Sequence, residues 1–234
     1  MYFKVSKKEF YNALSVAARA ISTFSPLPAF SGVKIEATMD CLILTGSDSD
    51  ISIQTKLKKS EHCVLEIHDM GSIVIEAKYI LEIVRKIDAD EIEFEMLDGS
   101  LTKISGNTAE FRINGMRASE YPAIDFSKPN ECFNVSEDIL KKIILQTSFA
   151  TSDKETRPVL TGVNFQCKEH QLHCVATDSY RLAKKTVEIE ESLNFNITIP
   201  AKSLQEVVKT LEGEGDVEIA VNDKKAQFII HDTI

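Results

Sequence analysis

The stretch Pro28-Ala29-Phe30-Ser31-Gly32-Val33 recurs 130 residues further along the chain as Pro158-Val159-Leu160-Thr161-Gly162-Val163. The same offset relates Phe3-Lys4-Val5-Ser6 to Phe133-Asn134-Val135-Ser136, and Asp48-Ser49 to Asp178-Ser179. Matches that keep one register from residue 3 to residue 49 indicate an internal duplication. We therefore predict two copies of one folding unit.

The second copy is shorter than the first. After residue 49 the register slips, and Ala77-Lys78 returns as Ala201-Lys202. The first copy runs on to Tyr121-Pro122, whereas the chain stops at Ile234 before any equivalent of that ending. Two prolines and scattered polar residues over 119–130 exclude a regular element there. We predict domains at residues 1–128 and 129–234, the second being cut before its end.

Each copy is predicted to combine two helices with antiparallel strands, which is an α+β fold. Ser6 and Ser136 stand at N-cap positions, and apolar residues follow on one helical face. These residues are Phe10, Leu14, Ala17 and Ile21 in the first copy, and Leu140, Ile143, Ile144 and Ala150 in the second. Further helices are expected at 77–87 and 201–211. Strand-like runs occupy 2–5, 33–37, 41–45, 51–57, 63–67 and 132–135, and 91–96 should pair with 101–105 across Asp98-Gly99.

Composition places the chain among ordinary globular proteins. Its 234 residues suffice for two cores, with 43% hydrophobic and 27% charged residues. No segment approaches the roughly 18 consecutive apolar residues that a membrane span needs. The N-terminus enters strand-like alternation at Tyr2 without a charged-then-apolar leader, so we expect a cytoplasmic protein.

The cysteine pattern predicts free thiols and no metal site. The five cysteines are odd in number and form no CxxC pair. Residues 167–174 gather four potential ligands, but strand alternation would send His173 and Cys174 to opposite faces. We predict no metal and no cofactor.

The net charge of the predicted helices differs in sign from the net charge of the whole chain. A net charge of −9 argues against a nucleic-acid partner, because phosphate binding needs a positive surface. The four predicted helices carry a net +5, which leaves −14 on strands and loops. The helix charges are Lys7, Lys8, Arg19, Lys78, Arg85, Lys86, Lys141, Lys142, Lys202 and Lys209 against Glu9, Glu82, Glu137, Asp138 and Glu206. This predicts a basic inner side and an acidic outer side; alternatively, the lysines are only the solvated faces of the helices.

Residues Ala176-Thr177-Asp178-Ser179-Tyr180-Arg181-Leu182-Ala183 resemble the ATD-x-x-RLA signature of the bacterial DNA polymerase III beta subunit, the sliding-clamp family. Residues 157–163 resemble the opening of that family's second domain, and Leu27-Pro28 with 31–33 the matching place in its first. The resemblance implies a DNA-clamp fold without catalysis. It also implies a ring around duplex DNA that tethers the replicative polymerase for processivity.

The duplication separates fold positions from site positions. Residues shared by both copies, such as Asp48 and Asp178, are expected to serve the fold, and Asp178 suits a turn that accepts backbone N–H bonds. Positions that differ are better site candidates. The resemblance implies a pocket for linear peptide motifs of polymerases and clamp loaders, lined by Leu160, Thr177, Tyr180, Arg181 and Leu182 and flanked by Arg157. The family pocket also uses the third domain and the linker before it, so we expect an incomplete pocket; alternatively, Leu160 and Leu182 are core residues.

The resemblance also implies loose contacts with DNA. Arg85 and Lys202 match basic positions on the family's inner helices, and Lys78, Lys86 and Lys209 complete the predicted DNA-facing set. Phe24 stands near a position where the family often has an arginine, which puts that contact in doubt.

Three function classes remain to be compared. In the family, two chains of three domains form the homodimeric ring, so a two-domain chain is expected to be monomeric and unable to encircle DNA. A peptide-docking adaptor without DNA encirclement is the alternative. An enzyme is disfavoured, because the sequence has no phosphate-cradling glycine loop, GxSxG or HExxH motif.

Overall fold

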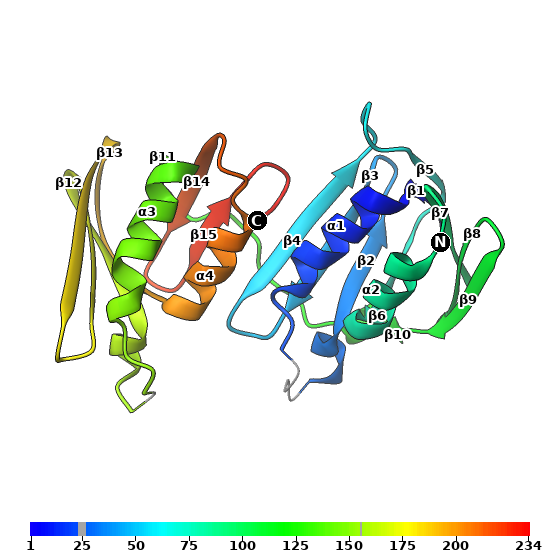
Figure 1. Ribbon diagram of the computed structural model, residues 1–234, viewed down its shortest axis with the longest axis horizontal. Helices are drawn as coiled ribbons and strands as arrows, with labels where there is room; N and C mark the ends of the chain where they lie inside the picture. Colours follow the sequence, from blue (N-terminus) through cyan, green and yellow to red (C-terminus); the bar gives the residue numbers. More distant parts are fainter. Residues whose placement is uncertain (23–26, 155) are drawn as a thin grey trace. The chain divides into compact units, whose positions relative to one another are not determined.

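The computed structural model describes residues 1–22, 27–154 and 156–234. The chain divides into two compact units, residues 1–125 and 126–232. Within the described residues each unit has two α-helices packed on antiparallel sheets (Figure 1), which confirms the predicted α+β class. Among these helices, none is long and apolar enough to cross a membrane.

The first unit contains two five-stranded antiparallel sheets, ordered β5-β1-β7-β8-β9 and β10-β6-β2-β3-β4. Helices α1 and α2 contact each other and the second of these sheets. The elements are β1 (Tyr2–Ser6), α1 (Lys7–Ala18), η1 (Pro28–Ser31), β2 (Gly32–Ala37), β3 (Cys41–Ser47), β4 (Ser52–Lys58), β5 (Leu65–Asp69), β6 (Gly71–Glu76), α2 (Ala77–Lys86), β7 (Glu91–Asp98), β8 (Leu101–Gly106), β9 (Ala109–Asn114), β10 (Met116–Arg117) and η2 (Ala118–Glu120).

The second unit repeats the plan with fewer separate strands. Its sheets are ordered β11-β14-β15 and β12-β13, again antiparallel, and α3 and α4 contact β12 and β13. The elements are β11 (Glu131–Ser136), α3 (Glu137–Thr147), η3 (Ser148–Ala150), η4 (Pro158–Thr161), β12 (Gly162–Thr177), β13 (Leu182–Pro200), α4 (Ala201–Thr210), β14 (Asp216–Val221) and β15 (Ala226–Ile229).

The duplication extends to strand register. Gly32 pairs with Glu76 just before α2, and Gly162 pairs with Pro200 just before α4. A Cβ atom on Gly32 would lie 2.9 Å from the Ile75 carbonyl oxygen, and one on Gly162 would lie 2.6 Å from the Ile199 carbonyl oxygen. Both copies therefore keep glycine because the neighbouring backbone leaves no room for a side chain.

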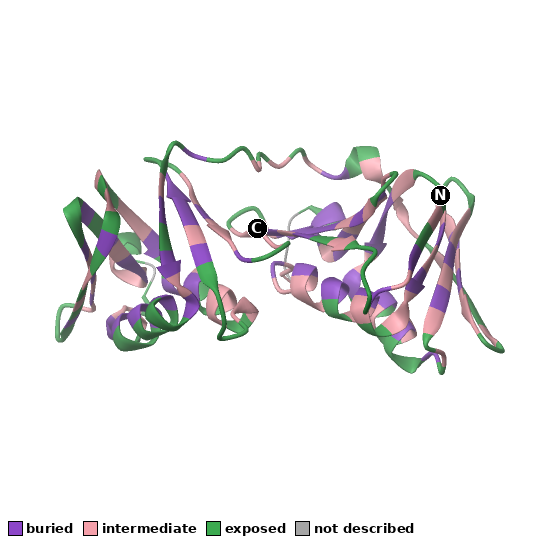
Figure 2. Ribbon diagram, turned by 90° about the horizontal axis from the view of Figure 1, so that it is seen from above, coloured by how far each residue is buried: buried purple, intermediate pink, exposed green. Residues whose placement is uncertain are grey.

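Apolar periodicity explains the two cores. Buried residues alternate with less buried ones along the strands and mark one side of each helix (Figure 2). In the first unit Phe3, Phe10 and Phe94 are fully buried, and the Phe3 and Phe94 rings stack at 4.8 Å. In the second unit Phe133 stacks on Phe195 at 5.6 Å. Each unit has its own hydrophobic core, because each contains a complete set of apolar faces.

Most predicted helix and strand features are confirmed, with corrections at the ends of α1 and α3. Ser136 accepts the Ile139 N–H at 3.3 Å, as an N-cap should, whereas the Ser6 hydroxyl instead accepts the Val64 N–H at 2.8 Å. Ser6 is the N-cap residue of α1, as predicted, but its side chain makes no capping hydrogen bond, because the strand pairing of β1 places Val64 beside it. Ile21 lies beyond α1 and is only partly buried, and Ala150 lies beyond α3, in η3, although it is buried. The prediction for Phe24 falls outside the described residues.

Two of the helix charges are also corrected. Arg19 is the residue after α1 instead of a member of it. Glu137 is 1% exposed, so its carboxylate does not offset basic residues on the surface of α3. The exposed surface of the helices is therefore shaped by different charges from those counted along the sequence.

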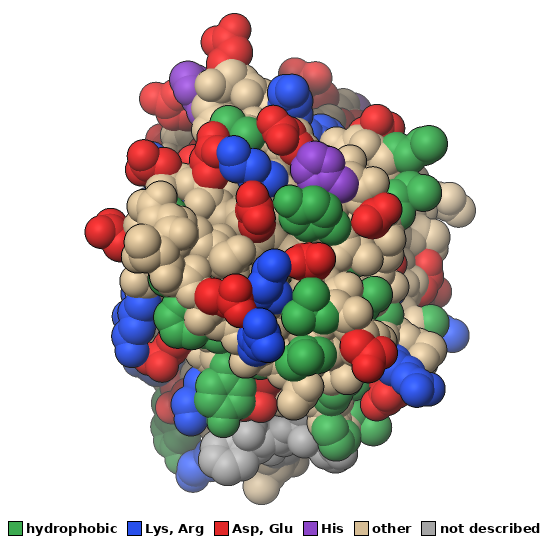
Figure 3. Space-filling model, turned by 90° about the vertical axis from the view of Figure 1, so that its right-hand side faces the viewer, with side chains coloured by type: hydrophobic (Ala, Val, Ile, Leu, Met, Phe, Trp, Pro, Cys, Tyr) green, Lys and Arg blue, Asp and Glu red, His purple; other side chains and the backbone are tan. Residues whose placement is uncertain are grey.

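One end of the first unit carries intermixed charges of both signs (Figure 3). Strand β1 places Lys4 beside Glu91, and β8 places Lys103 at 2.6 Å from Glu95. The hydrogen bond from each ammonium to its carboxylate raises the pKa of Lys4 and of Lys103. Lys4 and Lys103 are therefore each paired with a carboxylate on a surface of mixed charge.

Gly46 provides a test of helix-to-sheet packing. A Cβ atom on Gly46 in β3 would lie 2.1 Å from the Ala17 carbonyl oxygen of α1. The same offset of 130 places Ala176 in the second copy, where a methyl group is accommodated at 2% exposure. We expect Gly46→Ala to reduce the free energy of unfolding by about 1–3 kcal/mol through overpacking, measured by urea denaturation. An unchanged midpoint would show that α1 shifts without cost.

Candidate functional site

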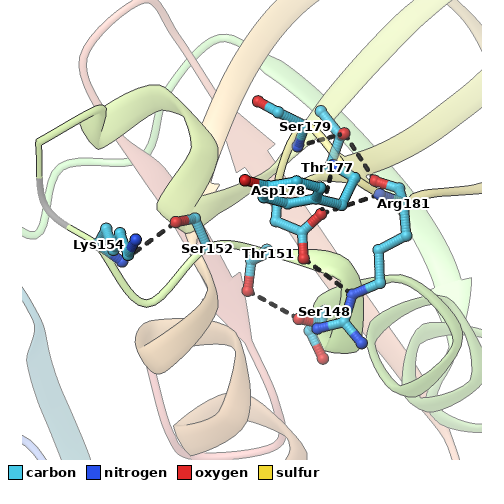
Figure 4. Close-up of polar contacts among 9 residues, drawn as sticks. Ser148, Thr151, Ser152, Lys154, Thr177, Asp178, Ser179 and Arg181 are labelled. Carbon is cyan, nitrogen blue, oxygen red and sulfur yellow. Dashed lines mark hydrogen bonds and ion pairs between the residues drawn. The ribbon is translucent and has the colours of Figure 1, made fainter.

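The turn between β12 and β13 is held by its own side chains (Figure 4). Thr177 donates its hydroxyl to the Arg181 carbonyl at 2.7 Å and accepts the Ser179 N–H at 3.2 Å. One carboxylate oxygen of Asp178 accepts the N–H groups of Tyr180 and Arg181, both at 2.9 Å. Ser179 has a φ of 77°, which this network stabilises. The predicted role of Asp178 as an acceptor of backbone N–H bonds is confirmed.

The first unit builds the same turn between β3 and β4. The Ser47 hydroxyl replaces that of Thr177 and donates to the Ile51 carbonyl at 3.1 Å. Asp48 accepts the N–H groups of Asp50 and Ile51 at 3.0 and 2.9 Å, and Ser49 has a φ of 88°. The turn itself therefore serves the fold, and what differs is the set of side chains that it presents.

Hydrogen bonding favours the ionised form of Asp178. The N–H groups of Tyr180 and Arg181, followed by the Arg181 guanidinium, hold the pKa of this carboxyl below its ordinary value of 3.8. Stability from this carboxylate is thus present above the unfolded-state pKa and is lost as the pH falls through the lower folded-state pKa. We expect an NMR titration to give Asp178 a midpoint below 3.8, with Asp178→Asn used to assign the signal. A midpoint above that value would contradict the hydrogen-bond network.

Arg181 is fixed from two sides. Its Nε donates to Asp178 Oδ2 at 3.0 Å, and its guanidinium lies over the Phe149 ring at 5.7 Å from the centroid. Arg157, at the start of η4, donates from Nη1 to the Ser179 hydroxyl at 3.3 Å. The Leu160 N–H in turn bonds the Arg157 carbonyl at 2.9 Å. Hydrogen bonds thus connect η4, which contains Leu160, to the turn that carries Tyr180 and Leu182.

The candidate residues present apolar surface to solvent. Tyr180 is 98% exposed and Leu182 is 66% exposed. The alternative that Leu182 is a core residue is therefore wrong. Leu160 is only partly buried. Asp50 and Ser52, which are the first-unit counterparts of Tyr180 and Leu182, are polar. Exposed large apolar side chains on a rigid turn are suited to binding another apolar surface.

A second difference between the copies adds to this exposure. In the first unit Tyr121 packs on Phe30 at 5.3 Å between ring centroids, and Ala29 is buried beside them. Burial raises the pKa of the Tyr121 hydroxyl, which donates to the Thr45 carbonyl at 3.4 Å. Val159, the counterpart of Ala29, is 67% exposed. The η4 region therefore offers apolar surface that the first unit keeps covered.

Two residues of this region were not predicted from the sequence. Phe149 was missed although it differs from its counterpart Arg19, which is the signal that selected Tyr180 and Leu182. Ser179 was missed because it is identical in both copies, at Ser49, and only its contact with Arg157 distinguishes it.

The basic residues predicted to face DNA are all exposed on helices. Lys78 and Arg85 lie on α2 with Lys86, and Lys202 and Lys209 lie on α4. Arg85 is 3.5 Å from Glu82, and Lys209 is 2.7 Å from Glu206. Such exposed ion pairs contribute little free energy.

Cysteine and histidine supply no alternative site in the described residues. The five cysteines are free, and no group of three or more His, Cys, Asp or Glu side chains there could hold a metal ion. Burial raises the pKa of Cys174 to about 12. A thiol that is buried and protonated is a poor nucleophile and a poor ligand.

Comparisons with known proteins match both units. A family model described as the N-terminal domain of the DNA polymerase III beta subunit matches residues 1–125, and one described as its central domain matches residues 134–234. The crystal structure of the DNA polymerase sliding clamp from Bacillus subtilis superposes with a TM-score of 0.96 at 35% identity, covering 100% of this chain and 63% of that one. The beta chain of DNA polymerase III from Streptococcus pneumoniae gives 0.95 at 32% identity, covering 99% of this chain and 63% of that one.

Curated relatives agree with these structures. The beta sliding clamp of Halalkalibacterium halodurans is 40% identical and that of Bacillus subtilis 38% identical, each over 97% of this chain. The chain spans 62% of the length of these relatives. Two family models and whole-chain similarity lead to one assignment: the chain belongs to the family of the DNA polymerase III beta subunit, the beta sliding clamp.

Proposed function

We propose that this chain is a subunit of a DNA sliding clamp, a non-catalytic protein that encircles duplex DNA and tethers the replicative polymerase for processivity. The observation that carries the proposal is the duplicated unit, because its two copies match the N-terminal and central domains of the family in order along the chain. Residues 1–128 and 129–234 would act as the two clamp domains. Tethering raises the effective concentration of the polymerase at its template, which requires no chemistry by the clamp.

The partner side of this function is assigned to the second unit. Polymerase and clamp-loader subunits would dock short peptide motifs on Leu160, Tyr180 and Leu182, with Thr177, Arg181 and Arg157 beside them. The exposed Leu182 and the partly buried Leu160 supply apolar area, and the Tyr180 ring supplies an amphipathic wall with few rotatable bonds. Because Asp178 and Phe149 hold Arg181, its guanidinium would be in place before the peptide arrives.

The DNA side is assigned to the helices. Lys78, Arg85, Lys86, Lys202 and Lys209 would contact phosphates without reading sequence. Exposed lysine and arginine side chains make contacts that exchange quickly between phosphates, which sliding along DNA requires. Double-stranded DNA is therefore the expected ligand of this surface.

Retention on circular DNA tests encirclement. Because the chain spans 62% of its relatives, we would join it to the remaining C-terminal part of the Bacillus subtilis clamp and load the chimera with a clamp loader. We expect retention on nicked circular DNA and loss when the DNA is linearised. Equal retention on both forms would contradict encirclement and favour a DNA-independent adaptor. By itself, the 234-residue chain is expected to be monomeric in light scattering.

A further inference from the structure

Helix α3 of the second unit and the residues after it expose apolar side chains that the core does not use. Leu145 lies in α3 and Phe149 in η3 directly after it, and each side chain is 58% exposed. Positions four apart in a helix lie on the same side, and the connecting Ser148 keeps a helical conformation with φ −60° and ψ −24°. The opposite side of α3 is buried in the core. Leu145 and Phe149, which we call the α3 track, therefore face solvent together.

The first unit has polar residues at both positions of the track. The offset of 130 makes Ser15 the counterpart of Leu145 and Arg19 the counterpart of Phe149. The Ser15 hydroxyl donates to the Tyr11 carbonyl at 2.8 Å, a local contact within α1. Because the fold forms with serine and arginine at these positions, it does not require apolar side chains there. Neighbouring large apolar side chains that stay exposed are instead typical of a binding surface.

The track adjoins the candidate peptide site. The segment η3, which contains Phe149, contacts both β12 and β13. The Arg181 guanidinium lies over the Phe149 ring at 5.7 Å from the centroid. Figure 4 shows the Arg181 side chain extending from the turn toward Ser148, the residue before Phe149. The exposed apolar surface that begins at Tyr180 and Leu182 therefore continues past Arg181 onto α3.

Arg181 offers hydrogen-bond donors between the turn and the track. Its Nε is bound to Asp178 at 3.0 Å, and among the described residues no hydrogen bond engages either of its Nη groups. Guanidinium N–H groups donate readily to carbonyl oxygens. A peptide that crosses from the turn to α3 would pass over these donors, which suit its backbone carbonyls.

The charges on the exposed side of α3 favour a peptide over nucleic acid as the occupant. Asp138, at the start of this side, takes the place of Lys8 in the first unit. Lys142, about one turn before Leu145, lies 3.5 Å from the Asp138 carboxylate. A carboxylate repels phosphate groups but is compatible with an uncharged peptide segment.

We propose that the docking peptide of a polymerase or clamp-loader subunit continues from the turn across Arg181 onto α3, where further apolar side chains of the peptide pack on Leu145 and Phe149. The inference rests on the proposed function, because the occupant is the same peptide chain that would bind Tyr180 and Leu182. An extended peptide advances about 3.3 Å per residue and one helical turn about 5.4 Å. Two apolar residues spaced two positions apart would therefore match the track.

Peptides of two lengths test the track on the 234-residue chain. Fluorescence anisotropy would compare a short peptide that carries only the glutamine, leucine and phenylalanine anchors with longer peptides. The longer ones add, at one end or the other, four residues with two leucines spaced two positions apart, or four serines as a control. We expect one leucine extension to raise affinity about tenfold over the short peptide, since it buries exposed apolar area on both sides. The serine extensions should give no gain.

Leu145→Ser, which introduces the residue of the first unit, should remove this gain and leave the affinity for the short peptide unchanged. Leu97→Ser is the matched control, because Leu97 is also an exposed leucine but lies in β7 of the first unit. Equal loss in the two variants, equal gain from serine and leucine extensions, or no gain from any extension would overturn the inference. A lower affinity for a DNA duplex in Leu145→Ser, with peptide binding unchanged, would assign the track to nucleic acid instead.

The short peptide keeps this inference separate from the proposed function. If the short peptide binds and Leu182→Ala weakens it, the docking site stands even when the extensions fail. If neither the short nor the extended peptides bind, both the docking site and the track are contradicted.

Discussion

Leu182→Ala is expected to weaken binding of a peptide that carries a glutamine with leucine and phenylalanine anchors by about thirtyfold, or about 2 kcal/mol. Leu182 is 66% exposed in the free protein, so a docked peptide would bury most of its side chain. Removing a large apolar contact at the centre of a small interface affects mainly the dissociation rate. Tyr180→Ala should act in the same direction. Fluorescence anisotropy with a labelled peptide would measure both effects.

The duplicated turn provides the control for this experiment. Asp50→Ala alters the first-unit counterpart of Tyr180 on a turn with the same hydrogen bonds, and it should leave peptide affinity unchanged. Because Tyr180 and Leu182 are exposed, neither variant should disturb folding. If Asp50→Ala and Leu182→Ala changed the affinity equally, the peptide site would not lie on the second unit.

The second large effect is expected in the core of the first unit. Phe94→Ala should reduce the free energy of unfolding by about 3–5 kcal/mol, since it removes a fully buried ring and leaves a cavity. The lost ring stacks on Phe3 at 4.8 Å and meets Phe10 edge to face at 6.3 Å. Urea denaturation followed by circular dichroism should show an early transition of the first unit alone, because the second unit has its own core.

Phe111→Ala is the matched control for this prediction. The Phe111 side chain is 37% exposed on β9, at the edge of the same sheet, so its removal should have a much smaller effect on unfolding. Equal destabilisation by the two variants would mean that the aromatic cluster does not dominate the stability of the first unit.

The helices and strands followed from local patterns. Apolar spacing predicted α1 and α3, and alternation with Asp98-Gly99 predicted the β7–β8 hairpin, whose Gly99 has a φ of 47°. The donor to the Ser6 hydroxyl could not be predicted this way. A serine hydroxyl serves whichever donor is nearest, and Val64, which is 58 residues away, is brought to it by strand pairing.

The candidate site was likewise predictable from the sequence only in part. Comparison of the two copies selected Tyr180, Arg181 and Leu182, because they differ from the residues at the matching positions of the first copy. Side chains that the shared turn does not require could diverge. It did not reveal that Phe149 supports Arg181 or that Arg157 reaches Ser179 across 22 positions. Such contacts depend on how η3 and η4 fold back onto the turn.

By itself, the sequence determined the duplication, the α+β class, the family resemblance and the identity of the diverged turn residues. Periodicity, short motifs and the internal repeat predict these properties, and each is found by comparing positions along the sequence without knowing which residues are in contact. Only the tertiary structure decided that Lys7 meets the carbonyl of Ile87 and that its counterpart Glu137 is buried against Gly213. The physical reason is that a linear pattern encodes local backbone preference and burial, whereas a site depends on which distant atoms the folded chain brings within hydrogen-bonding distance.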